Sequence, residues 1–300
     1  MTARFPATGR VTRAGYGQCM QAGVVGGGIM GAGIAEVVAV AGNDVTVVES
    51  TEAFAEAARG RIDTSLQRAV KAGRATEEQA QAALARISLV TDLDALADRE
   101  LVIEAVPEDE RIKTELFARL DAIVRPGVVL ATNTSSIPIT RIAAATGRPD
   151  RVVGIHFFNP VPVLPLVEIV AGPLTGAHTV EEAEEFARSL GKRTIRAKDR
   201  AGFVVNALLV PYLLSAIRMV EAGHATPEDI DAGMVAGANH PMGPLALTDL
   251  IGLDTTAAVA ESMYAEFKEP LYAPPPLLRR MVEAGLLGRK SGRGFFSYDR

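Results

Sequence analysis

The sequence predicts an α/β protein in which a doubly wound, mostly parallel sheet is followed by an all-helical C-terminal domain. Three observations support this prediction. In the first two thirds of the chain, short apolar runs alternate with longer stretches that have helical spacing, as in sheets built from strand–helix–strand units. After about Ile195 no convincing strand follows, and helical segments are separated by Pro- and Gly-rich turns. Finally, a chain of 300 residues is long enough for one large domain and a second.

The predicted elements follow one another in a regular order along the chain. We expect strands at 19–25, 44–50, 101–106, 151–158 and 166–170, and at 127–136 a strand that runs into a polar loop. Helices are expected at 29–42, 54–86 (one or two exposed helices) and 109–124. In the C-terminal part, 203–217 is a nearly all-apolar helix, and Thr226 followed by Pro227 marks the start of another, as N-cap and first helical residue. The division predicted from this order is a flexible N-terminal extension at 1–17, a sheet domain at 18–197 and a helical domain at 198–300.

Composition narrows the classes of function. A net charge of -5 provides no basic field for nucleic acid. The apolar run at 203–217 is shorter than the roughly 20 residues of a membrane helix, and Asn206 and Pro211 interrupt it. We therefore expect neither a nucleic acid nor a membrane as partner. A single cysteine, Cys19, excludes an internal disulfide and fits the cytoplasm. No pair of His or Cys residues has the spacing of metal ligands, so no metal is expected.

A glycine-rich turn lies between the first predicted strand and the first predicted helix. Three glycines form the pattern G-x-G-x-x-G, which permits a tight turn and lets backbone N–H groups approach a pyrophosphate at a helix N-terminus. Glu49 ends the next strand, where a carboxylate can accept hydrogen bonds from the adenosine ribose hydroxyls and would repel a 2′-phosphate. The alternative is a turn that binds nothing. The pattern favours NAD over NADP, held by Gly26, Gly28, Ile29, Met30, Gly31 and Glu49.

Two ionisable residues stand out in the apolar stretch GIHFFNPVPVLPLVEIV at 154–170. His156 and Glu168 occupy two strand-like runs that a proline-rich connection joins. An NAD enzyme that oxidises an alcohol needs a base for the hydroxyl proton, and histidine suits this task near neutral pH. A carboxylate on one imidazole nitrogen would fix the tautomer and raise the basicity of the other nitrogen. A catalytic dyad and a purely structural buried pair are equally compatible with this segment alone.

Seven motifs stand out in order along the chain. They are GGGIMGAGIAEVVAVAG, TNTSS, GIHFFNPVP, LVEIV, AGFVVNALLVPYLLSAI, HPMGPLALTDLIGLDTT and GRKSGRGFFSY. Together they resemble the 3-hydroxyacyl-CoA dehydrogenase family, and its bacterial 3-hydroxybutyryl-CoA dehydrogenase branch above all. The resemblance runs in the family's order from about Gln18 to the C-terminus, and its most specific motifs are HFFNPVP and PMGPLALTD.

The resemblance implies a Rossmann-type NAD domain, a helical domain that forms most of a homodimer interface, and the reversible oxidation of L-3-hydroxyacyl-CoA to 3-oxoacyl-CoA. It implies His156 as base, Glu168 as its electrostatic partner, Ser135 as hydrogen-bond donor to the reacting oxygen, and Asn206 near the thioester. As the only amide in an apolar helix, Asn206 could instead cap or bridge helices. Further contacts with NAD would come from Glu108, Lys113, Ser135, Asn159 and Lys290, and Ser65 would contact coenzyme A.

The sequence departs from the family at two positions. The acid after the second strand is often Asp in the family and is Glu49 here. The family's basic contact to a coenzyme A phosphate falls at or beside Ala72, so Lys71 or Arg74 would have to replace it. Two alternatives to the implied activity remain at this stage. They are a related NAD dehydrogenase that acts on a free hydroxy acid or sugar acid, and a non-catalytic NAD-binding protein.

Overall fold

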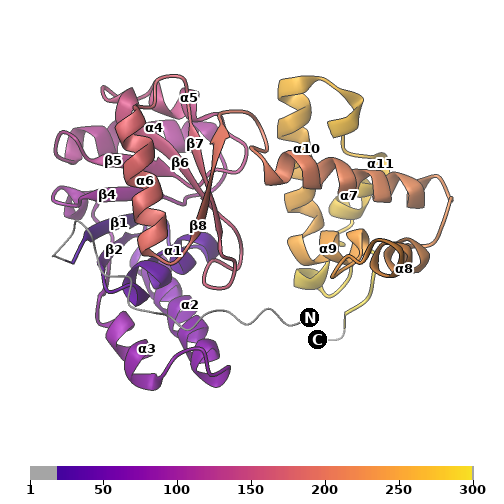
Figure 1. The fold of residues 1–300 in the computed structure, drawn as a ribbon, viewed down its shortest axis with the longest axis horizontal. Coiled ribbons are helices and arrows are strands. Elements are labelled where there is room, and N and C mark those ends of the chain that lie inside the picture. The colour runs from indigo at the N-terminus through magenta and orange to yellow at the C-terminus, as the bar shows by residue number, and fades with distance from the viewer. Residues whose placement is uncertain (1–18, 299–300) are drawn as a thin grey trace.

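The structure is a computed structural model that describes residues 19–298. The N-terminal extension predicted at 1–17 lies outside the described residues. Figure 1 shows a sheet-containing N-terminal unit beside a helical C-terminal unit, with the chain passing from one to the other after the last strand. The α/β class and the all-helical second part that the sequence predicts are thereby confirmed.

The N-terminal unit is built on one eight-stranded sheet with the order β3-β2-β1-β4-β5-β6-β7-β8. All strand pairs are parallel except β6 and β7. The strand order reverses between β1 and β4, and sheets of this kind bind ligands at the carboxyl ends of the strands near such a point. The strands are β1 (Gln21–Val25), β2 (Asp44–Val48), β3 (Ile87–Val90), β4 (Leu101–Glu104), β5 (Val129–Thr132), β6 (Val152–Phe157), β7 (Leu166–Ala171) and β8 (Arg193–Lys198).

The two edge strands, β3 and β8, are the strands that the sequence prediction missed. β8 has the sequence RTIRAK, in which the three charged residues are exposed and the residues between them are half-buried or buried. β3 is a four-residue strand with only Ile87 fully buried. Edge strands are commonly short or charged, which limits unwanted pairing with other chains, so they lack the continuous apolar run that identifies a central parallel strand.

Helices cover both faces of the sheet, as expected for a doubly wound fold. One face packs against α1 (Ile29–Val40), α2 (Glu52–Lys71), α3 (Glu77–Leu84) and α6 (Ala177–Ser189). The other face packs against the short η1 (Leu93–Leu96), α4 (Glu110–Ile123) and α5 (Ile139–Ala143), and η2 (Pro149–Arg151) precedes β6. The stretch at 54–86 forms two helices, because Thr76 starts α3 with a reciprocal capping box to Gln79, which satisfies two backbone donors at a new N-terminus.

The C-terminal unit packs its helices around a separate apolar core. It contains α7 (Val205–Glu221), α8 (Pro227–Ala238), α9 (Pro244–Ile251), α10 (Leu253–Phe267), η3 (Pro270–Tyr272), α11 (Pro276–Glu283) and η4 (Arg289–Ser291). Thr226 caps α8 as expected, because its hydroxyl accepts a hydrogen bond from the Asp229 amide. Among the described residues, none of the helices combines the length and the apolar character needed to cross a membrane.

The buried carboxylate of Asp249 fixes the end of the described chain onto α9. It accepts hydrogen bonds from the amides of Phe295 and Phe296 and from the Tyr298 hydroxyl, all at 2.9 Å. Burial, together with the bond to this carboxylate, raises the pKa of Tyr298 to about 12. The segment GRGFFSY is therefore part of the helical unit's framework.

The two units contact each other at the carboxyl ends of β6 and β5. Glu168 on β7 accepts hydrogen bonds from the backbone amides of Val204 and Val205 at the start of α7, at 3.1 and 2.9 Å. Ser262 on α10 donates to the carbonyl of Ser136 in the loop after β5, at 3.3 Å. Both contacts lie next to residues that the sequence marks as candidates for catalysis.

Candidate active site

The geometry of the β6–β7 pair brings His156 and Glu168 together. These two residues lie directly opposite each other in the antiparallel register, so their side chains project from the same face of the sheet. Imidazole Nδ1 and carboxylate Oε2 are 2.7 Å apart, and the two residues are only 4% and 0% exposed. The carboxylate accepts from Nδ1–H, which leaves the lone pair of Nε2 directed to the other side of the ring.

Ser135 completes a chain of three side chains. Its hydroxyl oxygen lies 2.9 Å from His156 Nε2, the nitrogen that the bond to Glu168 leaves without a proton. The serine hydroxyl therefore donates to Nε2, and Ser135, His156 and Glu168 form one continuous hydrogen-bond chain. An acid–base group oriented in this way by a second residue is the arrangement of general-base catalysis.

Asn206 lies in the first turn of α7, one residue beyond an amide that donates to Glu168. The residue is half-buried, and its amide makes no hydrogen bond to any residue between 19 and 298. The described structure thus offers no support for a capping or bridging role. Because residue 206 follows directly on the Val205 amide that contacts Glu168, an Asn206 amide without a partner among the described residues is available for a substrate oxygen.

Glu108 organises the loop that carries Ser135. One of its carboxylate oxygens accepts hydrogen bonds from the Thr134 hydroxyl at 2.6 Å, the Ser135 amide at 2.9 Å, and the amide and hydroxyl of Ser136 at 3.1 and 3.0 Å. Burial acts to raise the pKa of this carboxyl, but the Lys113 ammonium and the loop donors outweigh burial and lower it. Glu108 therefore fixes the backbone position of Ser135.

Lys113 is a buried cation beneath the same loop. The residue is 1% exposed, and its ammonium contacts Glu104 at 2.5 Å, Glu108 at 3.2 Å and the Val106 carbonyl at 3.2 Å. Burial raises the pKa of Glu104, although Lys113 counteracts this rise. These contacts give Glu108 and Lys113 a supporting role under Ser135, and their direct contact with NAD stays a prediction.

The glycine-rich turn has the shape that the G-x-G-x-x-G pattern requires. Gly26 has φ 91°, and a Cβ on Gly31 would lie 1.7 Å from the Gly26 carbonyl oxygen, so neither position accepts a side chain. A Cβ on Gly28 would meet nothing within 4 Å. Gly28 is the N-cap of α1, whose first turn has no capping side chain and no acid. The helix N-terminus is thus open to an anion, which fits the pyrophosphate of NAD.

Glu49 reaches this turn from the end of β2. Its Oε1 accepts a hydrogen bond from the Gly27 amide at 2.6 Å, so the longer side chain of Glu still places a carboxylate beside the turn. Ile29 and Met30 begin α1 at the same place, and Ile29 is 69% exposed. The residues present fit a bound NAD, with the turn at its phosphates and Glu49 at a ribose.

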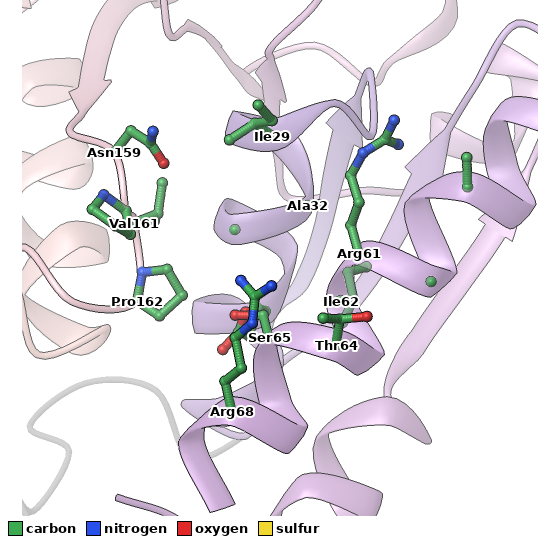
Figure 2. A pocket seen from close by; sticks show the side chains of 15 residues that line it. Ile29, Ala32, Arg61, Ile62, Thr64, Ser65, Arg68, Asn159, Val161 and Pro162 are labelled. Atoms are coloured by element: carbon green, nitrogen blue, oxygen red, sulfur yellow. The ribbon is translucent and has the colours of Figure 1, made fainter. Parts of the chain in front are cut away.

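The remaining candidates lie farther apart. Asn159 and Ser65 both line a cavity of about 700 Å³ between α1, α2 and the loop that follows β6 (Figure 2). Lys71 is exposed at the end of α2 and does not belong to the residues that line this cavity. Lys290 lies in the helical unit, where its ammonium pairs with the Asp254 carboxylate. Ser65 and Asn159 therefore line the same cavity, whereas Lys71 and Lys290 lie outside it.

Glu36 and Arg68 also line this cavity, and neither was identified as a candidate from the sequence. The sequence does contain a feature that marks Glu36, because it is the only ionisable residue in the apolar helix at 29–40. Arg68 could also have been identified, since it lies three residues after Ser65 and therefore on the same side of a helix.

Comparisons with known proteins agree with this geometry. The family model for the NAD binding domain of 3-hydroxyacyl-CoA dehydrogenase matches residues 21–200, and the model for the C-terminal domain matches residues 202–298. The chain belongs to the 3-hydroxyacyl-CoA dehydrogenase family. It is therefore an NAD-dependent oxidoreductase, and its cofactor is NAD.

Individual relatives place the chain within this family. The 3-hydroxybutyryl-CoA dehydrogenase of Mycobacterium tuberculosis is 62% identical over 278 residues, which cover 92% of this chain and 97% of that protein. Human mitochondrial hydroxyacyl-coenzyme A dehydrogenase is 43% identical over 92% of this chain and 90% of its own length. Among solved structures, FadB2 of M. tuberculosis has a TM-score of 0.92 at 61% identity and covers 94% of this chain and 100% of its own. The (S)-3-hydroxybutyryl-CoA dehydrogenase of Ralstonia eutropha has a TM-score of 0.89 at 45% identity, with the same coverage.

Proposed function

We propose that this enzyme reversibly oxidises the 3-hydroxyl group of L-3-hydroxyacyl-CoA thioesters to a 3-oxo group, with 3-hydroxybutyryl-CoA as its short-chain substrate. The family and the printed activities of the M. tuberculosis and R. eutropha relatives support the substrate class. The observation that carries the proposal is the hydrogen-bond chain of Ser135, His156 and Glu168. It supplies a buried proton acceptor at the carboxyl ends of the strands. The glycine-rich turn proposed to bind NAD lies at the same edge of the sheet.

The proposed chemistry divides proton and hydride between two sites. NAD, when bound at the glycine-rich turn, would supply the acceptor for the hydride that leaves C3 of the substrate. His156 Nε2 accepts the proton of the 3-hydroxyl group, and the Glu168 carboxylate stabilises the imidazolium that forms. The Ser135 hydroxyl donates to Nε2 in the structure. Once the substrate hydroxyl takes its place at Nε2, the serine hydroxyl turns to donate to the reacting oxygen, where charge develops. In the reducing direction the imidazolium returns the same proton to the oxygen.

The other polar groups of the site have matching tasks in this proposal. The unpaired Asn206 amide binds an oxygen at the thioester end of the substrate and polarises it. The turn at 26–31 and Glu49 bind the pyrophosphate and a ribose of NAD, with Glu108, Lys113, Asn159 and Lys290 as further contacts to the cofactor. Lys290 is available for this only if the cofactor competes with Asp254 for its ammonium.

The cavity between α1 and α2 is the proposed site for the nucleotide end of coenzyme A. The loop at 159–162 leads away from β6, the strand that carries His156, and forms one wall of the cavity. Ser65 on α2 lies in the opposite wall (Figure 2). A thioester held at His156 can thus extend along this loop until its nucleotide reaches the cavity. Lys71, which does not line the cavity, remains a proposed contact to a phosphate of coenzyme A.

We further propose a cytoplasmic homodimer that forms through the helical unit. Leu208 and Met219 on α7 are 74% and 44% exposed, and Val235 on α8 is 43% exposed. Large apolar side chains exposed at a surface can mark an interface, and a second copy of the chain is the occupant proposed here. Sedimentation velocity should show a dimer that Leu208→Asp converts to a folded monomer. A monomeric wild type would refute this part of the proposal.

Substrate class is tested by following NADH oxidation with acetoacetyl-CoA and with free acetoacetate. The expected result is fast turnover of the thioester and turnover of the free acid that is lower by orders of magnitude. Equal rates with the two compounds would favour a dehydrogenase of free hydroxy acids and would contradict the proposal.

A further inference from the structure

The side of α2 that faces the cavity carries a row of two arginines and a serine. Arg61, Ser65 and Arg68 line it at spacings of four and three residues, so they share one side of the helix. Figure 2 shows Ser65 and Arg68 facing Val161 and Pro162 across the cavity. The family's expected cation near Ala72 is absent from this wall.

The two arginines of this row differ in their contacts. Arg61 donates a hydrogen bond from Nη1 to the Gly27 carbonyl at 3.2 Å and is therefore committed to the NAD turn. Arg68 forms no hydrogen bond or ion pair with the residues that the structure describes. It is exposed, so its guanidinium is free for an anionic ligand in the cavity.

Glu36 on α1 is an independent sign of a ligand. It lines the cavity, is 3% exposed, and its Oε2 has no hydrogen-bond partner within the described part of the chain. Burial raises the pKa of this carboxyl, against the opposing effects of the Ser65 hydroxyl and of Arg74 and Lys192. A buried acceptor without a partner is costly, and a hydrogen-bond donor on a ligand in the cavity would remove the cost.

The rest of the wall is suited to an aromatic base. Ile29, Ala32, Val161 and Pro162 supply apolar surface next to Glu36. A purine that lies against this surface would offer the amino group at its edge to Oε2, and a phosphate on its ribose would meet the free guanidinium. Planar guanidinium groups bind phosphate through paired hydrogen bonds.

We propose that Glu36 and Arg68 are the residues that select the nucleotide of coenzyme A, with Glu36 Oε2 accepting from the adenine amino group and Arg68 binding the 3′-phosphate. This assignment rests on the proposed function and deepens it. It replaces the basic residue that the family pattern places at or beside Ala72 with an arginine one helical turn earlier on the same side of α2.

Three substrates separate the two contacts: acetoacetyl-CoA, acetoacetyl-dephospho-CoA and acetoacetyl-pantetheine. Arg68→Ala should lower kcat/KM about tenfold for acetoacetyl-CoA alone, because only this substrate carries the 3′-phosphate. Glu36→Leu should lower it for both adenine-containing substrates and spare the pantetheine thioester. The losses should appear in KM, since both contacts lie far from the reacting carbon.

Matched variants make the test decisive. Arg59→Ala, on the same helix but outside the cavity wall, should behave like wild type with all three substrates. Arg68→Lys and Glu36→Gln should retain most of the discrimination among the three substrates. The lysine keeps a cation for the phosphate, and the glutamine keeps an oxygen acceptor for the adenine amino group. The pantetheine thioester reports on folding and chemistry within each variant.

Two results would overturn the assignment. One is an equal loss with all three substrates in Arg68→Ala and Glu36→Leu, and the other is a loss specific for acetoacetyl-CoA in Lys71→Ala with none in Arg68→Ala. A wild-type enzyme that turns over none of the three thioesters would instead refute the proposed function itself.

Discussion

The dyad region and the cavity between α1 and α2 differ in how far the protein satisfies its own polar groups. At the dyad, both nitrogens of His156 and both oxygens of Glu168 have partners. In the cavity, the guanidinium of Arg68 and one oxygen of the buried Glu36 have none among the described residues. The contrast indicates that the chemical groups are oriented before substrate arrives, whereas the recognition groups are completed by the ligand.

The largest expected effect comes from removing the proton acceptor on the preorganised side. His156→Gln should lower kcat by about a thousandfold, within the usual range for general acid–base catalysis, and leave NAD affinity nearly unchanged. Steady-state kinetics and titration of NADH fluorescence measure the two quantities. Unchanged turnover would show that the dyad is a structural pair.

An intermediate effect is expected at the glycine-rich turn. This turn resembles the cavity because the first amides of α1 have no side-chain cap and can bind an anion. Glu49→Ser should weaken NAD binding about tenfold, as for the loss of a hydrogen bond to a charged group, and should weaken NADPH binding less. The reason is that, in the proposed complex, the carboxylate would bind the ribose hydroxyls of NAD and would repel the 2′-phosphate of NADPH. Equal losses for the two cofactors would argue against the ribose contact.

A smaller effect concerns the support beneath Ser135 and depends on pH. The folded pKa of Glu108 is lowered, so its stabilising contribution is present above its unfolded value of 4.5 and is lost as pH falls through the folded pKa. The stability difference between wild type and Glu108→Gln should therefore shrink as pH decreases from 7 to below 4. Urea unfolding at several pH values measures it, and a difference that grows toward acid pH would contradict the role given to Glu108.

The sequence reveals these two regions to different degrees, for physical reasons. Central strands are predictable because burial on both faces requires apolar runs, but the exposed edge strand β8 carries arginines and lacks this signal. His156 and Glu168 stand out because charges in apolar runs need a partner. Ser135 and Asn206 were assigned through motifs, since their roles depend on the proximity of segments that are distant in sequence. Arg68 lies on a helix rich in charge, and only the structure shows that this arginine lines the cavity without a hydrogen-bond or ion-pair partner among residues 19–298.

The central claim is that His156 and Glu168 act as one proton-transferring unit, and a double-variant cycle tests it most directly. The kcat of wild type, His156→Gln, Glu168→Gln and the double variant would be measured with acetoacetyl-CoA and NADH. Residues that act as a unit give strongly non-additive losses, so the double variant should be no slower than His156→Gln alone. Losses that multiply in the double variant would show that the two residues act independently and would contradict the account.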